Sequence, residues 1–452
     1  MTRRNQPVRF PEGSDAVELD SAIYSIRRKV EFYMQMELRS SVARFSFAAA
    51  CLMTVGLYLH FSFRAWFASY LSTSLDMPKF QNAIRLEPAN ADYHDLLGRK
   101  LALSGTSLDE AISEYREAVH LNPYEARYWL DLADAYQFAG RTGEKEESVL
   151  HAVAADGTTP YVAWVAANFF LLQGDRERAF RYFRVVLAND PEEVDSSLQL
   201  CWRASGDAIE VMDKALPPRS DLYLSFLRLL IAKEEVGAAE KVWNRLIGLH
   251  QVFSVKAALS YFQLLIIKQE VEAAKTAWDQ VANIDASLQP YLQRSENLVV
   301  NGGFEETLLN GGFDWWYQTH PSAALAIDTS QFHRGTRSLE VTFNGHSVPG
   351  VQLVQFIPVT PNTYYEFRAE SRTEDIDTAS GPRFAVVDAY TNFSYVLTDD
   401  ILGTTPWHLE QTRFQTGPNT NLLAIKIVRE PPQPLIRGKL WIDDVELVKT
   451  FN

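Results

Sequence analysis

The chain has 452 residues, of which 46% are apolar and 12% aromatic, a composition that excludes a disordered chain and allows two or three domains with separate cores. Its formal net charge is −14, although residues 1–71 carry nine Lys/Arg against six Asp/Glu, so the acidic excess lies in the rest. Such an acidic body argues against nucleic acid and anionic lipid as main partners, because both require clustered Lys and Arg.

The first segment, residues 1–44, is predicted to hold an amphipathic helix. Asp15 and Glu18 have the spacing of a capping box at a helix start. Apolar residues then recur in steps of four and three, at Leu19, Ile23, Ile26, Val30 and Tyr33. Two interpretations remain open: the helix lies on the membrane or on its own neighbour, or it pairs with a second copy.

An apolar run, FSFAAACLMTVGLYLHFSF, follows over residues 45–63 and contains no formal charge. At about 1.5 Å per residue it reaches roughly 28 Å, close to the hydrocarbon thickness of a bilayer. The run predicts one transmembrane helix, with a buried core helix as the alternative. Its N-terminal flank is the more basic, with Arg27, Arg28, Lys29, Arg39 and Arg44 against Arg64 and Lys79.

The basic flank predicts that the N-terminus is cytoplasmic and that the bulk of the chain lies outside the cytoplasm. The two cysteines, Cys51 and Cys201, lie in an apolar run and in a repeat, so no disulfide framework is expected. Exported repeats without a disulfide pair favour a single-pass protein of the bacterial inner membrane with a periplasmic or extracytoplasmic body.

The middle of the chain, residues 75–290, repeats itself. The stretch LSFLRLLIAKEEVGAAEKVW from Leu224 matches LSYFQLLIIKQEVEAAKTAW from Leu259 at an offset of 35. Asn122-Pro123, Asp156-Gly157 and Asp190-Pro191 follow each other at intervals of 34. Periods of this length are typical of stacked helix pairs.

These repeats resemble tetratricopeptide repeats. The family's packing positions fall on Trp129, Leu132, Ala133 and Tyr136 in one helix, and on Ala111, Tyr115, Ala118 and Pro123 in the one before. The resemblance implies an α-solenoid that binds protein partners in a groove, here lined by Arg99, Asp134 and Asn168. The alternative is a solvated face without a partner.

From Asn297 to the end, short stretches such as TYYEFRAES and LLAIKIV alternate apolar and polar residues between turn signals. This pattern predicts an all-β sandwich or jelly roll over residues 296–452. The predicted fold class is therefore multidomain: one transmembrane helix, an all-α solenoid and a β-sandwich.

The β-region resembles carbohydrate-binding modules of the family 4/9 type, through NLVVNGGFEE, HRGTRSLEVTF, PWHLEQTRFQT and LWIDDVELV. The sequence NGGF occurs twice; the first copy, at Asn301 to Phe304, is the family motif, and the second, at Asn310 to Phe313, is interpreted as a loop leading to Trp315 or Trp316. The resemblance implies a structural Ca²⁺ held by the carbonyls of Gly303 and Arg337 and the carboxylates of Glu305 and Asp443. Arg334 stands where members can supply another carboxylate, which disfavours the metal.

Polysaccharide is the other partner that the resemblance implies. Sugar recognition requires flat rings and fixed hydrogen-bonding groups. Strand alternation and loop position select Tyr364, Arg368, Tyr390, Phe393 and Arg429 as candidate carbohydrate-binding residues. Against this, residues 344–350, where sugar-binding members often place an aromatic residue, contain none, which favours a structural or protein-binding role.

Catalytic motifs are not evident. GHSVPG at residues 345–350 departs from a nucleophile elbow because Pro349 replaces the required glycine, and the nine histidines have no metal-like spacing. Three non-catalytic functions remain: a membrane-anchored scaffold that binds proteins through its repeats, a glycan-binding receptor of the cell envelope, and an accessory subunit of a larger membrane complex.

Overall fold

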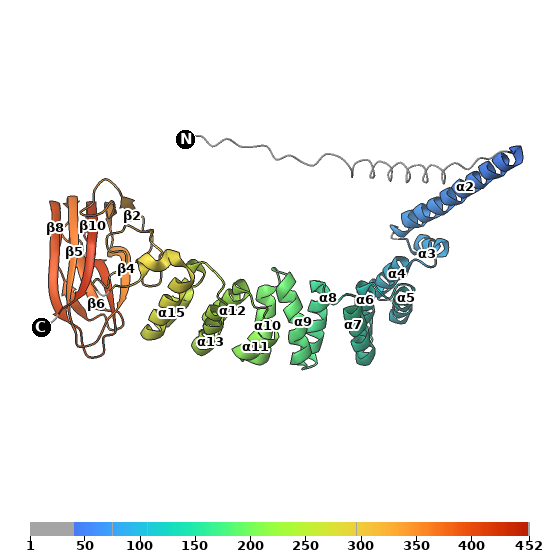
Figure 1. Ribbon diagram of the computed structural model, residues 1–452, viewed down its shortest axis with the longest axis horizontal. Coiled ribbons are helices and arrows are strands. Elements are labelled where there is room, and N and C mark those ends of the chain that lie inside the picture. Colours follow the sequence, from blue (N-terminus) through green and yellow to red (C-terminus); the bar gives the residue numbers. More distant parts are fainter. Residues whose placement is uncertain (1–39, 75, 106, 295, 451–452) are drawn as a thin grey trace, which may run out of the picture. The chain divides into compact units, whose positions relative to one another are not determined.

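The computed structural model describes residues 40–74, 76–105, 107–294 and 296–450 (Figure 1). The amphipathic helix expected between Asp15 and Tyr33 lies outside the described residues. The chain divides into two compact units between Lys145 and Glu146. The predicted fold class is confirmed: helices make up the first part of the described chain, and a two-sheet β-sandwich follows.

The apolar run forms helix α2 (Ser41–Ser72), which is longer than predicted at both ends. The Ser40 side chain caps it by accepting the Ala43 N–H at 3.0 Å. Within the described part of the chain, α2 alone is long and apolar enough to cross a membrane. Its last turns pack against the next helix, because Ala68 is fully buried in a cluster with Phe80 and Tyr93.

The first unit continues with four helices and the start of a fifth: α3 (Met77–Leu86), α4 (Ala91–Ser104), α5 (Leu108–Leu121), α6 (Ala126–Phe138) and α7 (Thr142–Asp156). The alanines expected to let helices approach are fully buried at Ala111 and Ala118. Gly98 has the same role, since a Cβ there would lie 2.8 Å from the Tyr115 ring. The packing predicted from the repeat residues is therefore confirmed.

The second unit contains the remaining helices: α8 (Pro160–Leu172), α9 (Arg176–Asn189), α10 (Val194–Ser205), α11 (Ala208–Lys214), α12 (Ser220–Ala232), α13 (Val236–Gly248), η1 (Val255–Ala257), α14 (Leu259–Ile267), α15 (Val271–Ile284) and η2 (Ala286–Tyr291). The sequence match between Leu224 and Leu259 corresponds to two successive hairpins, α12–α13 and α14–α15. Their equivalent tryptophans, Trp243 and Trp278, are both buried.

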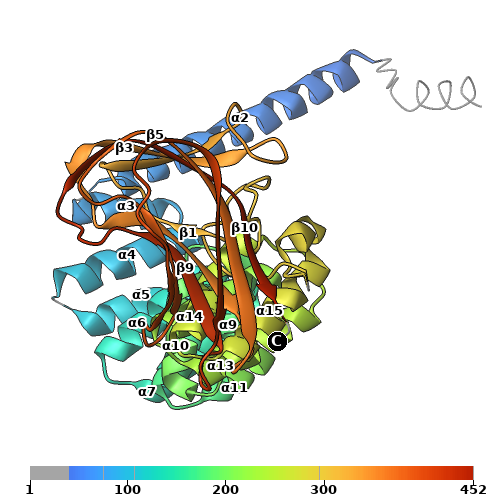
Figure 2. The same ribbon diagram turned by 90° about the vertical axis from the view of Figure 1, so that its left-hand side faces the viewer.

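The strands are β1 (Trp316–Tyr317), β2 (Ala323–Asp328), β3 (Ser338–Ser347), β4 (Gly350–Pro358), β5 (Tyr364–Asp377), β6 (Arg383–Asp388), β7 (Ser394–Leu397), β8 (Gly403–Gln415), β9 (Leu422–Val428) and β10 (Leu435–Lys449). They form two five-stranded antiparallel sheets. Sheet A has the order β1-β4-β9-β6-β7, and sheet B has the order β2-β3-β10-β5-β8. Figure 2 shows the long strands β5 and β10, which pair along most of their length.

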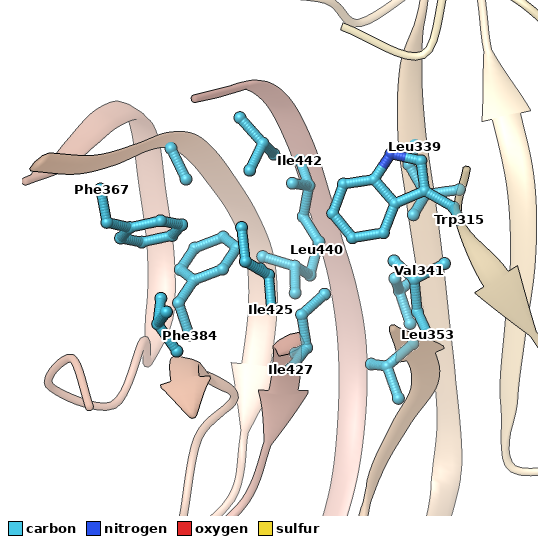
Figure 3. Close-up of a cluster of buried hydrophobic side chains, with 14 of the residues drawn as sticks. Trp315, Leu339, Val341, Leu353, Phe367, Phe384, Ile425, Ile427, Leu440 and Ile442 are labelled. Atoms are coloured by element: carbon cyan, nitrogen blue, oxygen red, sulfur yellow. The ribbon is translucent and has the colours of Figure 1, made fainter. Parts of the chain in front are cut away.

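The core of the sandwich lies between the two sheets (Figure 3). Sheet A contributes Leu353, Phe384, Ile425 and Ile427, and sheet B contributes Leu339, Val341, Phe367, Leu440 and Ile442. Alternation along β5 places Tyr365, Phe367 and Ala369 on this inner face. Trp315 closes one end of the core and stacks on Phe304 at 5.4 Å. Trp315 rather than Trp316 is therefore the core tryptophan.

Candidate functional site

The two copies of NGGF place their glycines against different surfaces. In the first copy, a Cβ on Gly302 would lie 2.1 Å from the Val445 carbonyl oxygen, so only glycine allows this approach to β10. In the second copy, Gly312 has φ +62°, and a Cβ there would lie 2.1 Å from the Trp278 ring. The second copy therefore packs against the last helix pair as well as leading to Trp315.

Trp278 is the centre of this junction between the helices and the sandwich. It is buried, donates its Nε1–H to the Tyr291 carbonyl at 3.1 Å, and meets the Phe313 ring edge-on at 6.0 Å. Gly311 packs on Leu259 of α14. Figure 1 shows the sandwich beside α15. The β-sandwich thus covers the apolar end of the last helical hairpin.

A second contact at the junction uses a residue selected for sugar binding. The Tyr390 hydroxyl donates a hydrogen bond to the Ile266 carbonyl of α14 at 2.9 Å. Burial raises the pKa of Tyr390 to about 12. The Tyr390 side chain is therefore engaged in attaching the sandwich to the repeats, a role that strand alternation and loop position did not reveal.

Two hollows adjoin this contact. One, of about 640 Å³, lies between Ile266 and Ile267 of α14 and the outer face of sheet A, where Val354, Phe356 and Lys426 contribute to its lining. The other, of about 950 Å³, has Gln269, Tyr390 and Phe393 in its lining, together with polar side chains that include Asn419 and Asn421. Both hollows combine residues from the repeats and the sandwich.

The remaining carbohydrate-binding candidates lie in different settings. Phe393 is 60% exposed, and Tyr364 is 37% exposed. Arg368 binds Glu366, whose carboxylate also accepts hydrogen bonds from Arg413 and Gln411 at 2.7 Å each. The bond from Arg413, followed by those from Gln411 and Arg368, lowers the pKa of Glu366 despite its burial. Arg368 is therefore part of a charged network on the outer face of sheet B.

Arg429 departs from the surface role expected for it. The side chain is 2% exposed. Its guanidinium donates to the carbonyls of Ser380, Val348 and Pro434 and to the Thr378 hydroxyl, at 2.7 to 2.9 Å. A buried guanidinium that joins three loops stabilises the end of the sandwich. From this position it does not reach a ligand on the surface, so the sequence-based assignment is corrected.

The residues expected to bind calcium gather in part. A Cβ on Gly303 would lie 3.6 Å from Oδ1 of Asp443 and 3.9 Å from Cγ of Glu305, whose carboxylate turns toward Gly335. Of the two carboxylates, that of Asp443 therefore faces Gly303. Asp443 is fully buried and accepts the N–H groups of His333, Arg334 and Asp444. Burial raises the pKa of Asp443. Arg334 directs its guanidinium toward Asp444, with Nε 3.7 Å from Oδ2, rather than into this cluster.

Glu305 is held by the segment that contains Arg337. It accepts the Thr336 N–H at 2.6 Å and the Arg337 N–H at 3.1 Å, and the Thr336 hydroxyl at 2.7 Å. Although desolvation opposes ionisation, these bonds keep the pKa of Glu305 below its ordinary value. Within the described ranges, no group of three or more His, Cys, Asp or Glu side chains is placed to hold a metal. A cation here would depend on two carboxylates and on backbone carbonyls, an oxygen set that suits Ca²⁺.

Charged side chains also gather on α4 and α6 of the first unit, a group named here the carboxylate face: Asp92, Asp95, Arg99, Arg127, Asp131 and Asp134. Arg99 is bound by Asp131 and lies 3.2 Å from the fully buried Asp95. Arg127 lies 2.7 Å from Asp92. Both arginines are thus paired within the face.

Asp134 is exposed at the surface of the carboxylate face. Its pKa is raised, first by desolvation and then by the neighbouring charge of Asp131. Asn168, the third groove residue expected from the sequence, lies in the second unit and donates to the Trp164 carbonyl of its own helix at 2.9 Å. Lys145 acts in the opposite direction and lowers the pKa of Asp134. Of the three predicted groove residues, Asp134 is the exposed carboxylate.

A buried acid lies next to the junction. Asp314 is fully buried, and its Oδ2 accepts the Leu309 N–H at 2.6 Å while Oδ1 has no hydrogen-bond donor. Burial raises the pKa of Asp314 to about 7. This carboxyl therefore changes its protonation near neutral pH in the folded protein.

Comparison with known proteins agrees with the two kinds of structure in this chain. Residues 296–431 match the family model described as "Carbohydrate binding domain". No curated protein matches the chain. The β-sandwich is similar to carbohydrate-binding modules, and the helical region is similar to tetratricopeptide repeats.

Solved structures similar to parts of the chain share little sequence with it. One described as "CBM4 structure and function" is 12% identical, covers 34% of this chain and 99% of its own, and has a TM-score of 0.27. The crystal structure of MamA is 14% identical, covers 35% of this chain and 88% of its own, and has a TM-score of 0.28. The CBM22-1 xylan-binding domain of Paenibacillus barcinonensis Xyn10C is 12% identical, covers 33% of this chain and 93% of its own, and has a TM-score of 0.23. Similarities of this size carry no argument about function.

Proposed function

We propose that this protein is a non-catalytic scaffold, anchored in the bacterial inner membrane by α2, with its N-terminus in the cytoplasm and its repeats and sandwich in the periplasm or outside the cell. The basic residues before α2 support this orientation. The repeats bind a protein partner, and the sandwich covers the end of the helical array.

The carboxylate face is the observation that carries this proposal. It holds four carboxylates, Asp92, Asp95, Asp131 and Asp134, against the guanidinium groups of Arg99 and Arg127. Because both arginines are paired inside the face, neither is available to bind a carboxylate from outside. Asp134 is exposed, and the neighbouring charge of Asp131 raises its pKa while Lys145 lowers it, so a further positive charge from a partner would favour its ionised form. The partner therefore presents Lys or Arg side chains to this surface.

The test is co-purification of the full chain from membranes in mild detergent, followed by the same experiment with Asp134→Lys. The matched control is Glu110→Lys, an equal charge reversal at an exposed position of α5. We expect the partner to be lost with Asp134→Lys, to be retained with Glu110→Lys, and to dissociate as salt is raised. Retention of the partner by both variants, or absence of any partner, contradicts the proposal.

Binding of envelope polysaccharide is the second candidate function, favoured by the family match over residues 296–431. Phe393 offers an exposed ring at the larger hollow. Since Tyr390 also holds the junction, Phe393→Ala is the variant that separates sugar binding from domain attachment. The measurement is calorimetry of the full chain with soluble polysaccharides, with Phe332→Ala as the control for an exposed ring elsewhere. Sugar binding that survives Phe393→Ala excludes this site.

A structural Ca²⁺ completes the proposal. The carbonyls of Gly303 and Arg337 and the carboxylates of Glu305 and Asp443 would hold it. As a hard cation, Ca²⁺ would neutralise the two carboxylates. It would also connect the first NGGF turn with the start of β3 and with β10. The approach of Asp443 to Gly303, with Glu305 beside the same turn and bound to the Arg337 N–H, supports this site.

A further inference from the structure

Helix α2 continues past the charge-free run and exposes an aromatic face, defined here as Phe63, Trp66, Phe67 and Tyr70. Trp66 is 62% exposed and Tyr70 64%. The rings contact one another along the helix: Phe63 lies 5.6 Å from Trp66 and 6.1 Å from Phe67, and Trp66 lies 6.2 Å from Tyr70. Four large rings in contact at the surface of one helix form a continuous apolar surface, a feature that marks an interaction site.

The opposite face of the same turns is fixed to the first repeats. Ala68 is fully buried and packs in a cluster with Phe80 of α3 and Leu97 of α4. Arg64 donates from Nε to the Leu86 carbonyl at the end of α3, at 2.5 Å. These contacts set the rotation of α2 about its own axis. The aromatic face therefore cannot turn inward onto the repeats.

The position of the aromatic face along α2 indicates what covers it. The face begins where the charge-free run ends, and no charged residue occurs between Arg64 and Asp76. At about 1.5 Å per residue, Trp66 lies roughly 4.5 Å and Tyr70 roughly 10 Å beyond Phe63 along the helix axis. The polar layer on each side of a bilayer is about 5 to 8 Å thick. If residues 45–63 fill the hydrocarbon, Trp66 lies within that layer. The backbone of Tyr70 then lies about 2 to 5 Å beyond it, and its side chain leans back toward the layer because helical side chains tilt toward the helix N-terminus.

We propose that the aromatic face binds the headgroup layer of the membrane and holds the first helical hairpin, α2–α3, against the bilayer surface. Trp and Tyr suit this layer because each combines an apolar ring with a polar N–H or O–H group. The inference rests on the proposed membrane anchoring, and it adds that the repeats begin at the membrane surface without a flexible spacer. The ligand is a lipid surface; a transmembrane helix of another protein is the competing occupant.

The experiment places a fluorescent label at single cysteines of the full chain in phosphatidylcholine nanodiscs, after Cys51 and Cys201 are replaced by alanine. Tyr70→Cys reports on the aromatic face, Val55→Cys on the charge-free run, and Tyr124→Cys on an 84% exposed position in the loop before α6. Nitroxide-labelled lipids, with the quencher on the headgroup or deep in the acyl chain, are then added in turn.

We expect the label at Tyr70 to lose fluorescence mainly to the headgroup quencher, the label at Val55 mainly to the acyl-chain quencher, and the label at Tyr124 to neither. Acyl-chain quenching at Tyr70 would overturn the inference by placing the face inside the hydrocarbon. A label at Tyr70 that no lipid quenches, with Val55 still quenched, also overturns it and leaves the face to a protein partner. Loss of quenching at Val55 as well would show that the membrane anchoring itself is wrong.

Discussion

Replacing Gly312 with alanine tests whether the second NGGF holds the sandwich on the repeats. The substitution adds a Cβ 2.1 Å from the Trp278 ring, at a residue with φ +62°. Trp278 has little freedom to move away, because it is buried and its Nε1–H is bonded to the Tyr291 carbonyl. We therefore expect Gly312→Ala to loosen the contact between the sandwich and α15.

The expected free-energy cost of Gly312→Ala has two parts. A left-handed conformation costs an alanine about 1 to 2 kcal/mol. Overpacking against a ring that cannot move adds about 1 to 3 kcal/mol. Gly174→Ala is the matched control, because Gly174 lies in the same unit with φ +79° and has no atom within 4 Å of its added Cβ. The control carries the first cost alone, so the difference between the two variants measures the packing at the junction.

Hydrogen exchange of the full chain is the appropriate assay, since a chain of several units does not unfold as one two-state system. A difference of 1 to 3 kcal/mol corresponds to a loss of protection of about 5- to 150-fold in α14 and α15 beyond the control. If Gly312→Ala reduces protection in α14 and α15 no more than Gly174→Ala reduces it in α8 and α9, the second NGGF is not a docking element and the reasoning fails.

Polar groups of the sandwich give three further predictions. Burial raises the pKa of Asp314 in the folded protein to about 7. Between about pH 4 and pH 7 the folded protein therefore retains a proton that the unfolded chain releases. The free energy of unfolding falls as the pH rises toward and through 7. Asp314→Asn should reduce this loss of stability with rising pH, when the free energy of unfolding in urea is followed by hydrogen exchange in the sandwich. An unchanged dependence of that free energy on pH would contradict the raised pKa of Asp314. Removing Ca²⁺ with a chelator should lower the melting temperature of the wild type and have little effect on Glu305→Gln; equal responses exclude the proposed metal site. Arg429→Lys should destabilise the sandwich by about 2 to 4 kcal/mol, because lysine cannot replace all four buried donors, and a change under about 0.5 kcal/mol would refute that role.

Much of the fold was predictable because its signals are local. The 34- and 35-residue spacings come from helix pairs that each pack on the next, and the alternation in TYYEFRAES comes from a strand with one buried face. The first NGGF was interpreted correctly as part of the sandwich because the turn contacts β10 of the same domain.

The candidate site was less predictable because it depends on contacts between regions distant in the sequence. Nothing near Tyr390 indicates that its hydroxyl meets the Ile266 carbonyl, and an exposed tyrosine in a loop equally suits a sugar. Arg429 likewise follows an apolar strand, where the sequence does not distinguish a surface arginine from one enclosed by three loops. The repetition of NGGF was the one available signal for the junction, since paired glycines in a loop often allow another surface to approach closely.

The covered hairpin α14–α15 also bears on assembly. Helix pairs stack on one another through the same apolar surface, so an open end of a solenoid is a place where a second copy can add by the same geometry, and then a third. Here Phe313 and Gly312 occupy that surface at Trp278. Growth of a head-to-tail filament from this end is blocked within each chain, and any higher-order assembly of this protein must use its other surfaces.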